Sequence, residues 1–305
     1  MKEVLHILIL SDGKPGHVNQ SQGLAEAIGR IHPVQVSLTS LQGSHSLLTR
    51  LKTAWREAGS VPSPQLILGA GHAVHTSLIA LSRRFGVPAV VMMKPTLPVS
   101  LFNLCLIPKH DLAGRKEHPK VIPTLGALNR VPPPDGRERS GGIILLGGPS
   151  GSHGWDAGII HASVQKIVTT CGNQQWEITD SRRSPDGTLD AIAKTCPALH
   201  LHPHGDTGRD WLPDRLSRTA EVWVTEDSVS MIYEALSSGS KVGLLPVPAL
   251  KKSGRVSRGI DELVDQGFAT RFRDWSPDPG LVAPPHVLRE ADRCAAIVLE
   301  KLNLP

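Results

Sequence analysis

Short runs of apolar residues, each ending near glycine, serine or aspartate, alternate along the chain with stretches that repeat apolar residues at helical spacing. This alternation is typical of strand–helix–strand units, in which helices bury a parallel sheet on both faces. In the first half we predict strands at Leu5–Leu10, Val34–Leu38, Leu66–Gly69, Ala89–Met93 and Leu104–Ile107. The intervening stretches predict helices at Gly23–Ile31, Leu47–Ala58 and Val74–Phe85.

The segment from Arg130 to Gly142 shows neither an apolar strand run nor helical spacing, because it combines three prolines, glycines and mixed charges. This composition predicts a linker. A second series of strands follows, at Ile143–Leu146, Trp176–Thr179, Leu199–Leu201, Glu221–Val224 and Val242–Leu245. The sequence thus predicts an α/β fold of two Rossmann-like domains, residues 1–135 and 136–305. The last stretch, His286–Leu302, has helical spacing and could cross back over the first domain.

Composition agrees with this division. The 305 residues exceed what one hydrophobic core usually holds. Hydrophobic residues make up 40% and charged residues 20%, which excludes a disordered chain, and only 4% are aromatic, which disfavours an all-β sandwich. The net charge of +5 favours an anionic partner such as a phosphate, a nucleic acid or an acidic membrane surface, without choosing among them.

Four scattered cysteines, Cys105, Cys171, Cys196 and Cys294, form no C-x-x-C pair, so neither a disulfide framework nor a zinc knuckle is indicated. The first apolar run, Val4–Leu10, is too short for a signal peptide, and no stretch is long enough to span a membrane. We expect a cytoplasmic protein that can contact the inner face of the cell membrane peripherally.

The turn after the first predicted strand, from Asp12 to His17, is rich in glycine and opens a helix. Such a turn exposes backbone N–H groups that attract anions, and it places reactive side chains at the carboxyl edge of the sheet. It lacks the ending of a Walker loop and the spacing of a dinucleotide fingerprint. A turn merely capped by Asp12 and Asn19 is the alternative. The candidates at this edge are Asp12, Lys14, His17, Asn19, Gln20 and the strand-ending Lys94.

Two turns of the second half carry phosphate-binding chemistry. The turn Gly147–Trp155 allows close backbone approach at Gly147 and Gly148, and its Ser150 can donate a hydrogen bond. Arg182 and Arg183 follow the next strand, where two guanidinium groups suit phosphate recognition. The alternatives are a long flexible turn and two solvated arginines.

The segment Val224–Ala235 is the sharpest signal, because a buried strand ends there and a helix with N-cap chemistry begins. Glu226 and Glu234 lie about two helical turns apart, which predicts that they share a helix face. Glutamates so spaced are similar to a motif of two-domain sugar transferases, in which one faces the sugar and the other the ribose. A capping role for Glu226, or for Asp227 with Ser228, is the alternative. The histidines of the His200–His204 run lack an accompanying ligand set, so we assign no metal.

Together these segments resemble the ELM family, the bacterial relatives of the plant elongated-mitochondria protein, which are often labelled mitochondrial-fission proteins. The resemblance covers nearly the whole chain. It rests on Asp12–His17 with Asn19 and Gln20, Gly69–His72, Met93–Pro95 with Pro98, Ile107–Asp111, Gly147–Ser150, Ser181–Arg183 and Thr225–Met231.

The resemblance implies a GT-B-like fold, in which two Rossmann-like domains face each other across a cleft. The second domain would hold a nucleotide-sugar donor and the first an acceptor, with His17 as the histidine that lipid-linked sugar transferases carry in this loop, and with His72 in the cleft. The sequence departs from the family at Gly205–Arg209, where many members carry Gly-x-Asn-Pro-Tyr. The family's contact between this loop and the donor is therefore not carried over to these residues.

The leading hypothesis is a metal-independent glycosyltransferase that needs no cofactor and moves a sugar, such as a hexosyl group, from a nucleotide-sugar to an envelope glycan or lipid acceptor, with no nucleic-acid partner. His17 or Asp12 would be the base. The predicted donor-binding residues are Gly147, Gly148, Ser150, Arg182, Arg183, Glu226, Asp227, Ser228, Ser230 and Glu234. The alternatives are a sugar-nucleotide epimerase and a non-catalytic binding or scaffold protein on the same fold.

Overall fold

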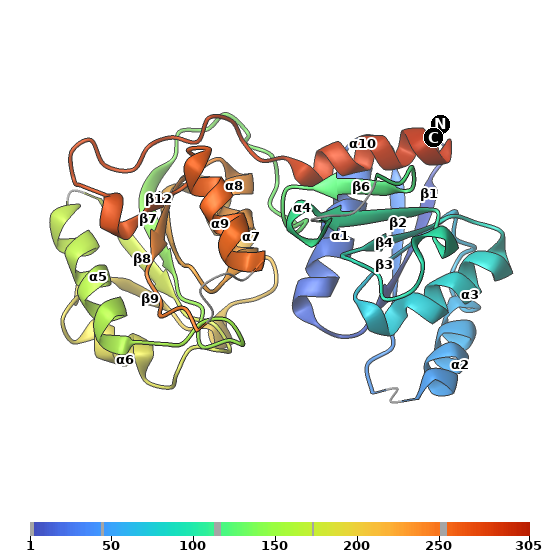
Figure 1. The fold of residues 1–305 in the computed structure, drawn as a ribbon, viewed down its shortest axis with the longest axis horizontal. Helices are drawn as coiled ribbons and strands as arrows, with labels where there is room; N and C mark the ends of the chain where they lie inside the picture. Colours follow the sequence, from blue (N-terminus) through green and yellow to red (C-terminus); the bar gives the residue numbers. More distant parts are fainter. Residues whose placement is uncertain (1–2, 44–45, 113–116, 173, 251–254) are drawn as a thin grey trace. The chain divides into compact units, whose positions relative to one another are not determined.

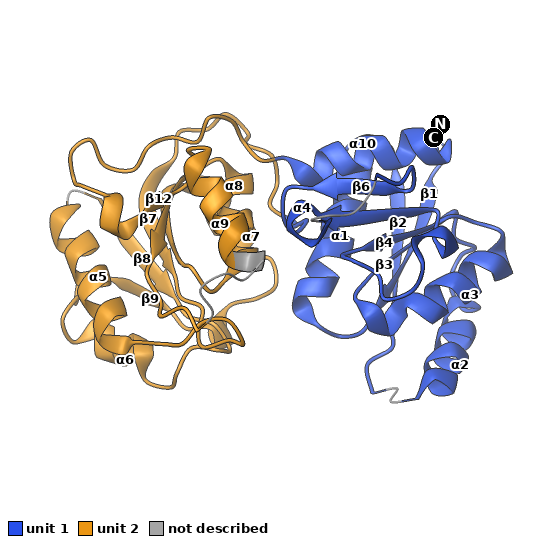
Figure 2. Ribbon diagram, in the orientation of Figure 1, with its two compact units in different colours: residues 1–130, 289–305 blue, residues 131–288 orange. Residues whose placement is uncertain are grey.

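A computed structural model describes residues 3–43, 46–112, 117–172, 174–250 and 255–305 (Figure 1). The chain divides into two compact units (Figure 2). Unit 1 comprises residues 1–130 together with 289–305, and unit 2 comprises residues 131–288.

In the described residues, unit 1 contains a six-stranded parallel sheet in the order β2-β1-β3-β4-β5-β6. Its strands are β1 Leu5–Ser11, β2 Val34–Ser40, β3 Leu66–Ala70, β4 Ala89–Met92, β5 Leu104–Pro108 and β6 Val121–Thr124. The central strands are buried along their length, as expected for parallel strands covered on both faces.

Helices cover both faces of this sheet. Their bounds are α1 Pro15–Gly29, α2 Leu47–Ala58, α3 His75–Phe85, α4 Lys109–Leu112 and α10 Glu290–Leu302, with short 3-10 turns η1 His72–Val74 and η2 Val99–Leu101. On one face, α1 and α10 bury Ile7 and Ile9 under a cluster that includes Leu24 and Val298. On the other, α2 and α3 cover Leu8 and Leu10.

In the described residues, unit 2 repeats the architecture with a six-stranded parallel sheet in the order β12-β11-β10-β7-β8-β9. Its strands are β7 Ser140–Leu145, β8 Trp176–Thr179, β9 His200–His202, β10 Thr219–Thr225, β11 Lys241–Leu245 and β12 Thr270–Arg271. Its helices are α5 Ala157–Thr170, α6 Thr188–Ala193, α7 Trp211–Arg218, α8 Val229–Ser238 and α9 Arg255–Asp265, with 3-10 turns η3 His204–Asp206 and η4 Phe272–Asp274. The buried Trp176 and Trp223 anchor the core between this sheet and the helices α5 and α6.

The α/β class and the two Rossmann-like sheets are confirmed, and most predicted strands agree with the structure within a few residues. Three details differ. Helix α1 begins at Pro15 instead of Gly23, because proline suits the first turn, where its missing N–H needs no partner. The edge strands β6 and β12 were not predicted, since Pro123 interrupts the first and the second spans only two residues. The strand β4 ends before Met93, whose φ of 69° lies in the left-handed region.

The last helix belongs structurally to the first unit. The sequence pattern places residues 136–305 in the second domain, with His286–Leu302 able to cross back over the first, and in the structure residues 289–305 pack in unit 1. Val298, Cys294 and Ala295 of α10 are fully buried in the core that α1 also covers. The chain therefore leaves unit 1 after residue 130, forms unit 2 and returns to unit 1 at residue 289.

All four cysteines are free. Burial raises the pKa of Cys105 and of Cys294 to about 12, so both thiols are protonated and inert at neutral pH. In the part of the chain that the structure describes, none of the helices is both long and apolar enough to cross a lipid bilayer.

Replacement of Val298 by alanine tests the place of α10 in unit 1. The change leaves a cavity among fully buried neighbours, so we expect the free energy of unfolding to fall by about 1.5–3 kcal/mol. Glu300→Ala, on the exposed side of the same helix, is the matched control and should change it little. Chemical denaturation measures both, and equal stability of the two variants would contradict the packing.

Candidate functional site

The turns that follow β1, β3 and β4 lie side by side at one edge of the unit 1 sheet, because these three strands are neighbours and parallel. Each turn carries polar side chains predicted for the site. Asp12 and His17 follow β1, His72 follows β3, and Lys94 follows β4. The sheet thus gathers at one edge residues that lie far apart in the sequence.

Asp12 and His17 form a hydrogen-bonded pair at the start of α1. The Nδ1 atom of His17 lies 3.0 and 2.9 Å from the two carboxylate oxygens of Asp12. The carboxylate also accepts a bond from the backbone N–H of Lys14, at 3.2 Å. The side chain of Asp12 is 6% exposed and that of His17 is 16% exposed. The pair is therefore held in a fixed geometry with the imidazole still reachable.

This contact determines which nitrogen of the histidine is free to act. A carboxylate only accepts hydrogen bonds, so the hydrogen of the neutral imidazole resides on Nδ1. The lone pair is then on Nε2, for which the described residues provide no hydrogen-bond partner. His17 is consequently arranged as a base whose orientation is set by Asp12.

Gly71 lies directly against the imidazole of His17. A Cβ atom at this position would come within 2.3 Å of the ring carbon Cε1 and 2.4 Å of Nδ1, and the backbone φ is 84°. Both the contact and the left-handed backbone therefore require glycine. The turn after β3 thus supports the ring that the turn after β1 presents.

The other predicted residues of this edge differ in their surroundings. Lys14 and His72 are exposed, whereas Asn19 and Lys94 are half-buried. Gln20 is buried and donates a hydrogen bond from Nε2 to the carbonyl oxygen of Gly16, at 3.4 Å, within its own helix. The side chain of Gln20 therefore forms its hydrogen bond within α1 in this structure.

His75 was not predicted, although it lies close to the predicted His72. Its side chain is buried, and Nδ1 lies 3.2 Å from the hydroxyl of Thr96, which joins the turns after β3 and β4. Burial, with a smaller contribution from His72, lowers the pKa of His75 to about 4. His75 is thus neutral at pH 7 and braces the edge. The available signal in the sequence was its position, three residues after the predicted His72.

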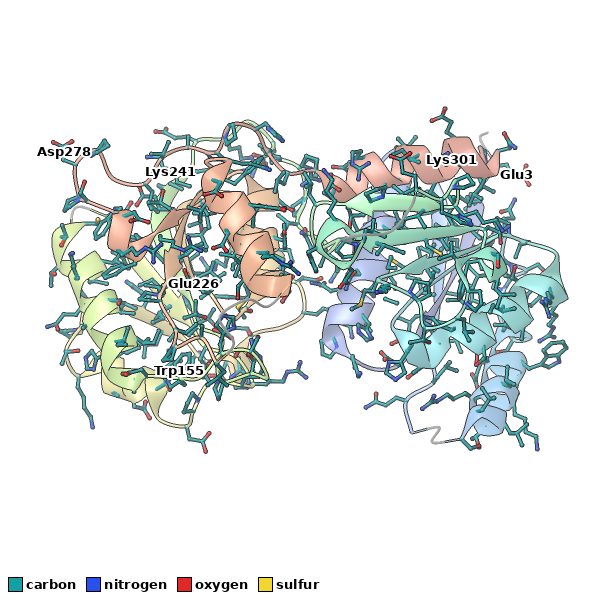
Figure 3. The ribbon with its side chains drawn as sticks, in the orientation of Figure 1. Glu3, Trp155, Glu226, Lys241, Asp278 and Lys301 are labelled. Atoms are coloured by element: carbon teal, nitrogen blue, oxygen red, sulfur yellow. The ribbon has the colours of Figure 1, made fainter. Side chains whose placement is uncertain are left out.

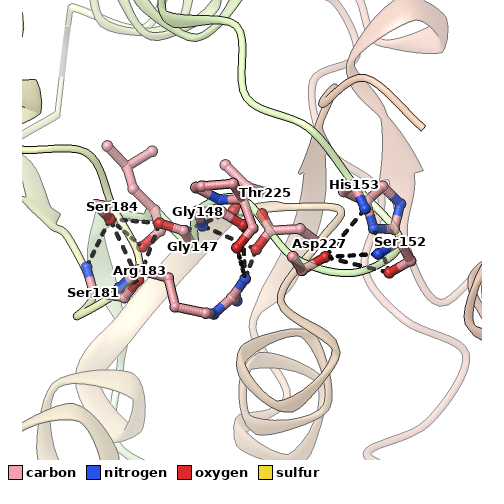
Figure 4. Close-up of polar contacts among 12 residues, drawn as sticks. Gly147, Gly148, Ser152, His153, Ser181, Arg183, Ser184, Thr225 and Asp227 are labelled. Atoms are coloured by element: carbon pink, nitrogen blue, oxygen red, sulfur yellow. Dashed lines mark hydrogen bonds and ion pairs between the residues drawn. The ribbon is translucent and has the colours of Figure 1, made fainter. Parts of the chain in front are cut away.

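In unit 2, the turns after β7, β8 and β10 converge in the same way and are joined by one buried carboxylate (Figure 4). The side chain of Asp227 is fully buried, and its Oδ2 accepts from the N–H of Gly148 at 2.9 Å and from Nη2 of Arg183 at 2.7 Å. Arg183 Nη1 also donates to the carbonyl oxygen of Gly148, at 2.7 Å. Ser181 and Thr225 both bond the backbone of Gly147. We call these six residues, Gly147, Gly148, Ser181, Arg183, Thr225 and Asp227, the Asp227 brace.

The two glycines are required for this brace by close approach. A Cβ atom on Gly147 would lie 2.2 Å from Oδ2 of Asp227, and one on Gly148 would lie 2.0 Å from the carbonyl oxygen of Arg183. Neither distance is tolerated. The structure therefore assigns Gly147, Gly148, Arg183 and Asp227 a direct role in shaping the loops.

Beside the brace lies a pocket of about 350 Å³ at the start of α8. Arg182, Ser228 and Ser230, all predicted to bind phosphate, line it together with Trp211 and His204. No side chain caps the N-terminus of α8, at Ser228. In the part of the chain that the structure describes, no ion pair or hydrogen bond holds the guanidinium of Arg182. The pocket thus combines an available cation with the positive end of a helix.

Glu226 and Glu234 do not share a helix face, which corrects the prediction from their spacing. Helix α8 begins at Val229, so Glu226 lies in the turn before it. Glu226, labelled in Figure 3, pairs with Arg271 at 3.2 Å. Both residues line a separate pocket of about 370 Å³, whereas Glu234 is buried within α8. Ser150 is engaged in its own turn, where its hydroxyl accepts from the N–H of His153 at 3.1 Å.

The histidines of the 200–204 run are used in separate contacts. His202 pairs with Glu177 at 2.9 Å, and His204 pairs with Asp180 at 3.0 Å at the rim of the α8 pocket. Among the described residues, no group of three or more His, Cys, Asp or Glu side chains is placed to hold a metal ion. His204, Thr207 and Trp211 were not predicted for this pocket, and only the position of β9 brings them there.

Solved structures of two epimerases and one glycosyltransferase share this fold. A candidate UDP-N-acetylglucosamine 2-epimerase from Listeria monocytogenes matches with a TM-score of 0.62 at 11% identity, covering 99% of this chain and 97% of that one. The UDP-GlcNAc 2-epimerase from Neisseria meningitidis, solved with UDP-GlcNAc, has a TM-score of 0.55 at 12% identity, covering 99% and 100%. AviGT4, a glycosyltransferase of avilamycin A biosynthesis, has a TM-score of 0.53 at 14% identity, covering 98% and 97%. These likenesses establish the GT-B-like, two-domain Rossmann fold.

At the level of sequence, an uncharacterized protein of Rickettsia prowazekii, RP120, is 21% identical over 88% of this chain and 91% of its own length. Residues 15–302 match the family described as mitochondrial fission ELM1. This match spans both units, from the first turn of α1 to the end of α10, and the chain belongs to the mitochondrial fission ELM1 family.

Proposed function

We propose that the protein is a metal-independent glycosyltransferase, which transfers a sugar from a nucleotide-sugar donor to a glycan or lipid-linked acceptor. The α8 pocket of unit 2 would hold the donor diphosphate, and the Asp12–His17 pair of unit 1 would activate the acceptor. The observation that carries the proposal is the α8 pocket, because it brings a cation and an uncapped helix N-terminus together.

The chemistry of the pocket suits a diphosphate. The N-terminus of α8 presents backbone N–H groups, and the hydroxyls of Ser228 and Ser230 line the same space. A guanidinium such as that of Arg182 binds two phosphate oxygens at once. As the bond between sugar and diphosphate breaks, these groups balance the charge of the leaving group, so the proposed reaction needs no divalent metal.

His17 would supply the second requirement, which is removal of the acceptor proton. Its Nε2 takes the proton of the acceptor hydroxyl while the oxygen forms a bond to the anomeric carbon and the nucleoside diphosphate departs. Asp12, bonded to Nδ1, stabilises the imidazolium that results. The proton then leaves His17 to solvent.

A sugar-nucleotide epimerase is the second candidate, favoured by the same acid–base pair and by the epimerases among proteins of this fold. The two reactions differ in their need for an acceptor. An epimerase alters the sugar of its substrate without one, whereas a transferase releases free nucleoside diphosphate only when an acceptor is present.

The deciding experiment has two steps. Calorimetry with UDP and with UDP-N-acetylglucosamine measures binding, and incubation with the nucleotide sugar, with and without membrane extract as acceptor, is followed by analysis of the products. UDP release that depends on the extract supports the transferase. An altered sugar without extract supports the epimerase. Absence of binding to any of a panel of nucleotides and nucleotide sugars would leave a scaffold protein on this fold.

The two adjacent arginines should respond differently to substitution. Arg182→Ala removes a charge that lines the pocket, so nucleotide affinity should fall at least about tenfold, with the melting temperature unchanged. Arg183→Ala leaves the buried Asp227 carboxylate without its ion-pair partner, so the melting temperature should fall. The control is Lys194→Ala, an exposed cation of the same unit. Calorimetry and thermal melts measure both properties, and equal nucleotide binding by wild type and Arg182→Ala would place the phosphate elsewhere.

His17→Ala should reduce turnover by about 10²–10⁴-fold while nucleotide binding is kept, because general-base help is lost and the α8 pocket proposed for the nucleotide lies in unit 2. Asp12→Asn should also slow turnover. The double variant should be hardly slower than His17→Ala, since residues that act as a unit lose activity non-additively. Steady-state rates measure the three variants, and additive losses would show that the two side chains act separately.

Gly71→Ala tests the support of the His17 ring. The new methyl group displaces the imidazole, so turnover should fall toward that of His17→Ala. Gly86→Ala is a matched control, because Gly86 also has a positive φ, of 65°, but has open space around its Cβ position. Both variants carry backbone strain, and only the first contacts the ring. If the two variants lost turnover equally, backbone strain alone would explain the effect.

A further inference from the structure

Helix α2 of unit 1 leaves large apolar side chains in solvent. It buries only Ala54 and Ala58 against the sheet. Leu47 is 52% exposed, Leu48 is 71% exposed and Trp55 is 51% exposed. A soluble surface rarely gathers such side chains on one helix without a partner.

Leu48 and Trp55 lie beside cations on the same flank of the helix. Leu48, Lys52 and Trp55 are spaced four and then three residues apart, so they share one face, and Arg56 follows on its polar side. Lys52 and Arg56 are exposed. We call Leu48, Lys52, Trp55 and Arg56 the α2 surface.

Helix α3, which packs beside α2, extends the positive charge. The guanidinium of Arg84 lies 4.2 Å from the centre of the Trp55 ring, and the neighbouring Arg83 is exposed. Glu57 is the acidic residue of α2, and its carboxylate is paired with Arg56 at 2.8 Å. The flank is therefore apolar at its centre and positively charged at its border.

We propose that the α2 surface docks on the headgroup region of an anionic lipid bilayer. Leucine side chains enter the acyl boundary, tryptophan prefers the interface, and lysine and arginine contact anionic headgroups. Each cation near an anionic surface adds attraction that salt screens. The charge complementarity favours lipid over an uncharged protein partner. The proposal does not depend on the proposed transferase activity, because binding to vesicles requires neither nucleotide nor acceptor.

Vesicle flotation with the full chain tests the apolar part. We expect binding to phosphatidylcholine vesicles that contain about one third phosphatidylglycerol, and much weaker binding to phosphatidylcholine alone. The double variant Leu48→Ser with Trp55→Ser should bind about tenfold less well. Leu250→Ser with Val282→Ser, which removes two exposed apolar side chains from unit 2, is the matched control and should bind like the wild type. Equal losses in both double variants would overturn the proposal.

A second arm tests the charges. Lys52→Gln with Arg83→Gln should weaken binding to the anionic vesicles about tenfold, and added salt should weaken wild-type binding in the same way. Lys194→Gln with Arg209→Gln, on unit 2, keeps the net charge equal to that of the test variant and should bind like the wild type. Thermal melts of all variants are the control for correct folding.

Sedimentation gives the outcome for a competing occupant. If the protein forms a dimer that Leu48→Ser with Trp55→Ser dissociates, and if the wild type does not float with vesicles, the α2 surface is an interface between copies and the lipid proposal is wrong.

Discussion

Parallel pairing of strands is the constraint on which the rest of this structure depends. A parallel pair needs a crossover, and most crossovers here contain helices, which bury both faces of each sheet. All strands of a sheet therefore end at the same edge, and the turns after them meet there. The Asp12–His17 pair in unit 1 and the α8 pocket in unit 2 are both built from such turns.

A buried carboxylate organises that edge in unit 2. The side chain of Asp227 has no solvent contact, so its buried charge must be compensated within the protein. Arg183 and the N–H of Gly148 provide this compensation. The close approach that this requires excludes side chains at Gly147 and Gly148. Polar residues at a strand end can thus hold loops together and need not bind a ligand. Since Arg183 is held by Asp227, Arg182 is the arginine whose guanidinium is available in the α8 pocket.

Unit 1 uses its edge differently. Its polar pair is held by two turns, one that supplies the carboxylate and one that places Gly71 under the ring, and the imidazole keeps one nitrogen available. The α2 surface lies on a helix that packs Ala54 and Ala58 on one face of the same sheet and leaves Leu48 and Trp55 exposed to solvent. The same unit therefore carries an acid–base pair and an apolar, cationic surface.

The sequence by itself determined the α/β class, the two Rossmann-like sheets and most strands, because buried parallel strands read as short apolar runs between glycine-rich turns. It also placed Asp12 and His17 together, since they lie within one turn and the start of its helix. It did not reveal β6, where Pro123 interrupts the pattern, and it left open whether the helix in His286–Leu302 returns to the first unit, as α10 does. Arg182 and Arg183 are chemically identical neighbours, and only the tertiary structure separates their roles, because the carboxylate that holds Arg183 comes from a turn distant in the chain.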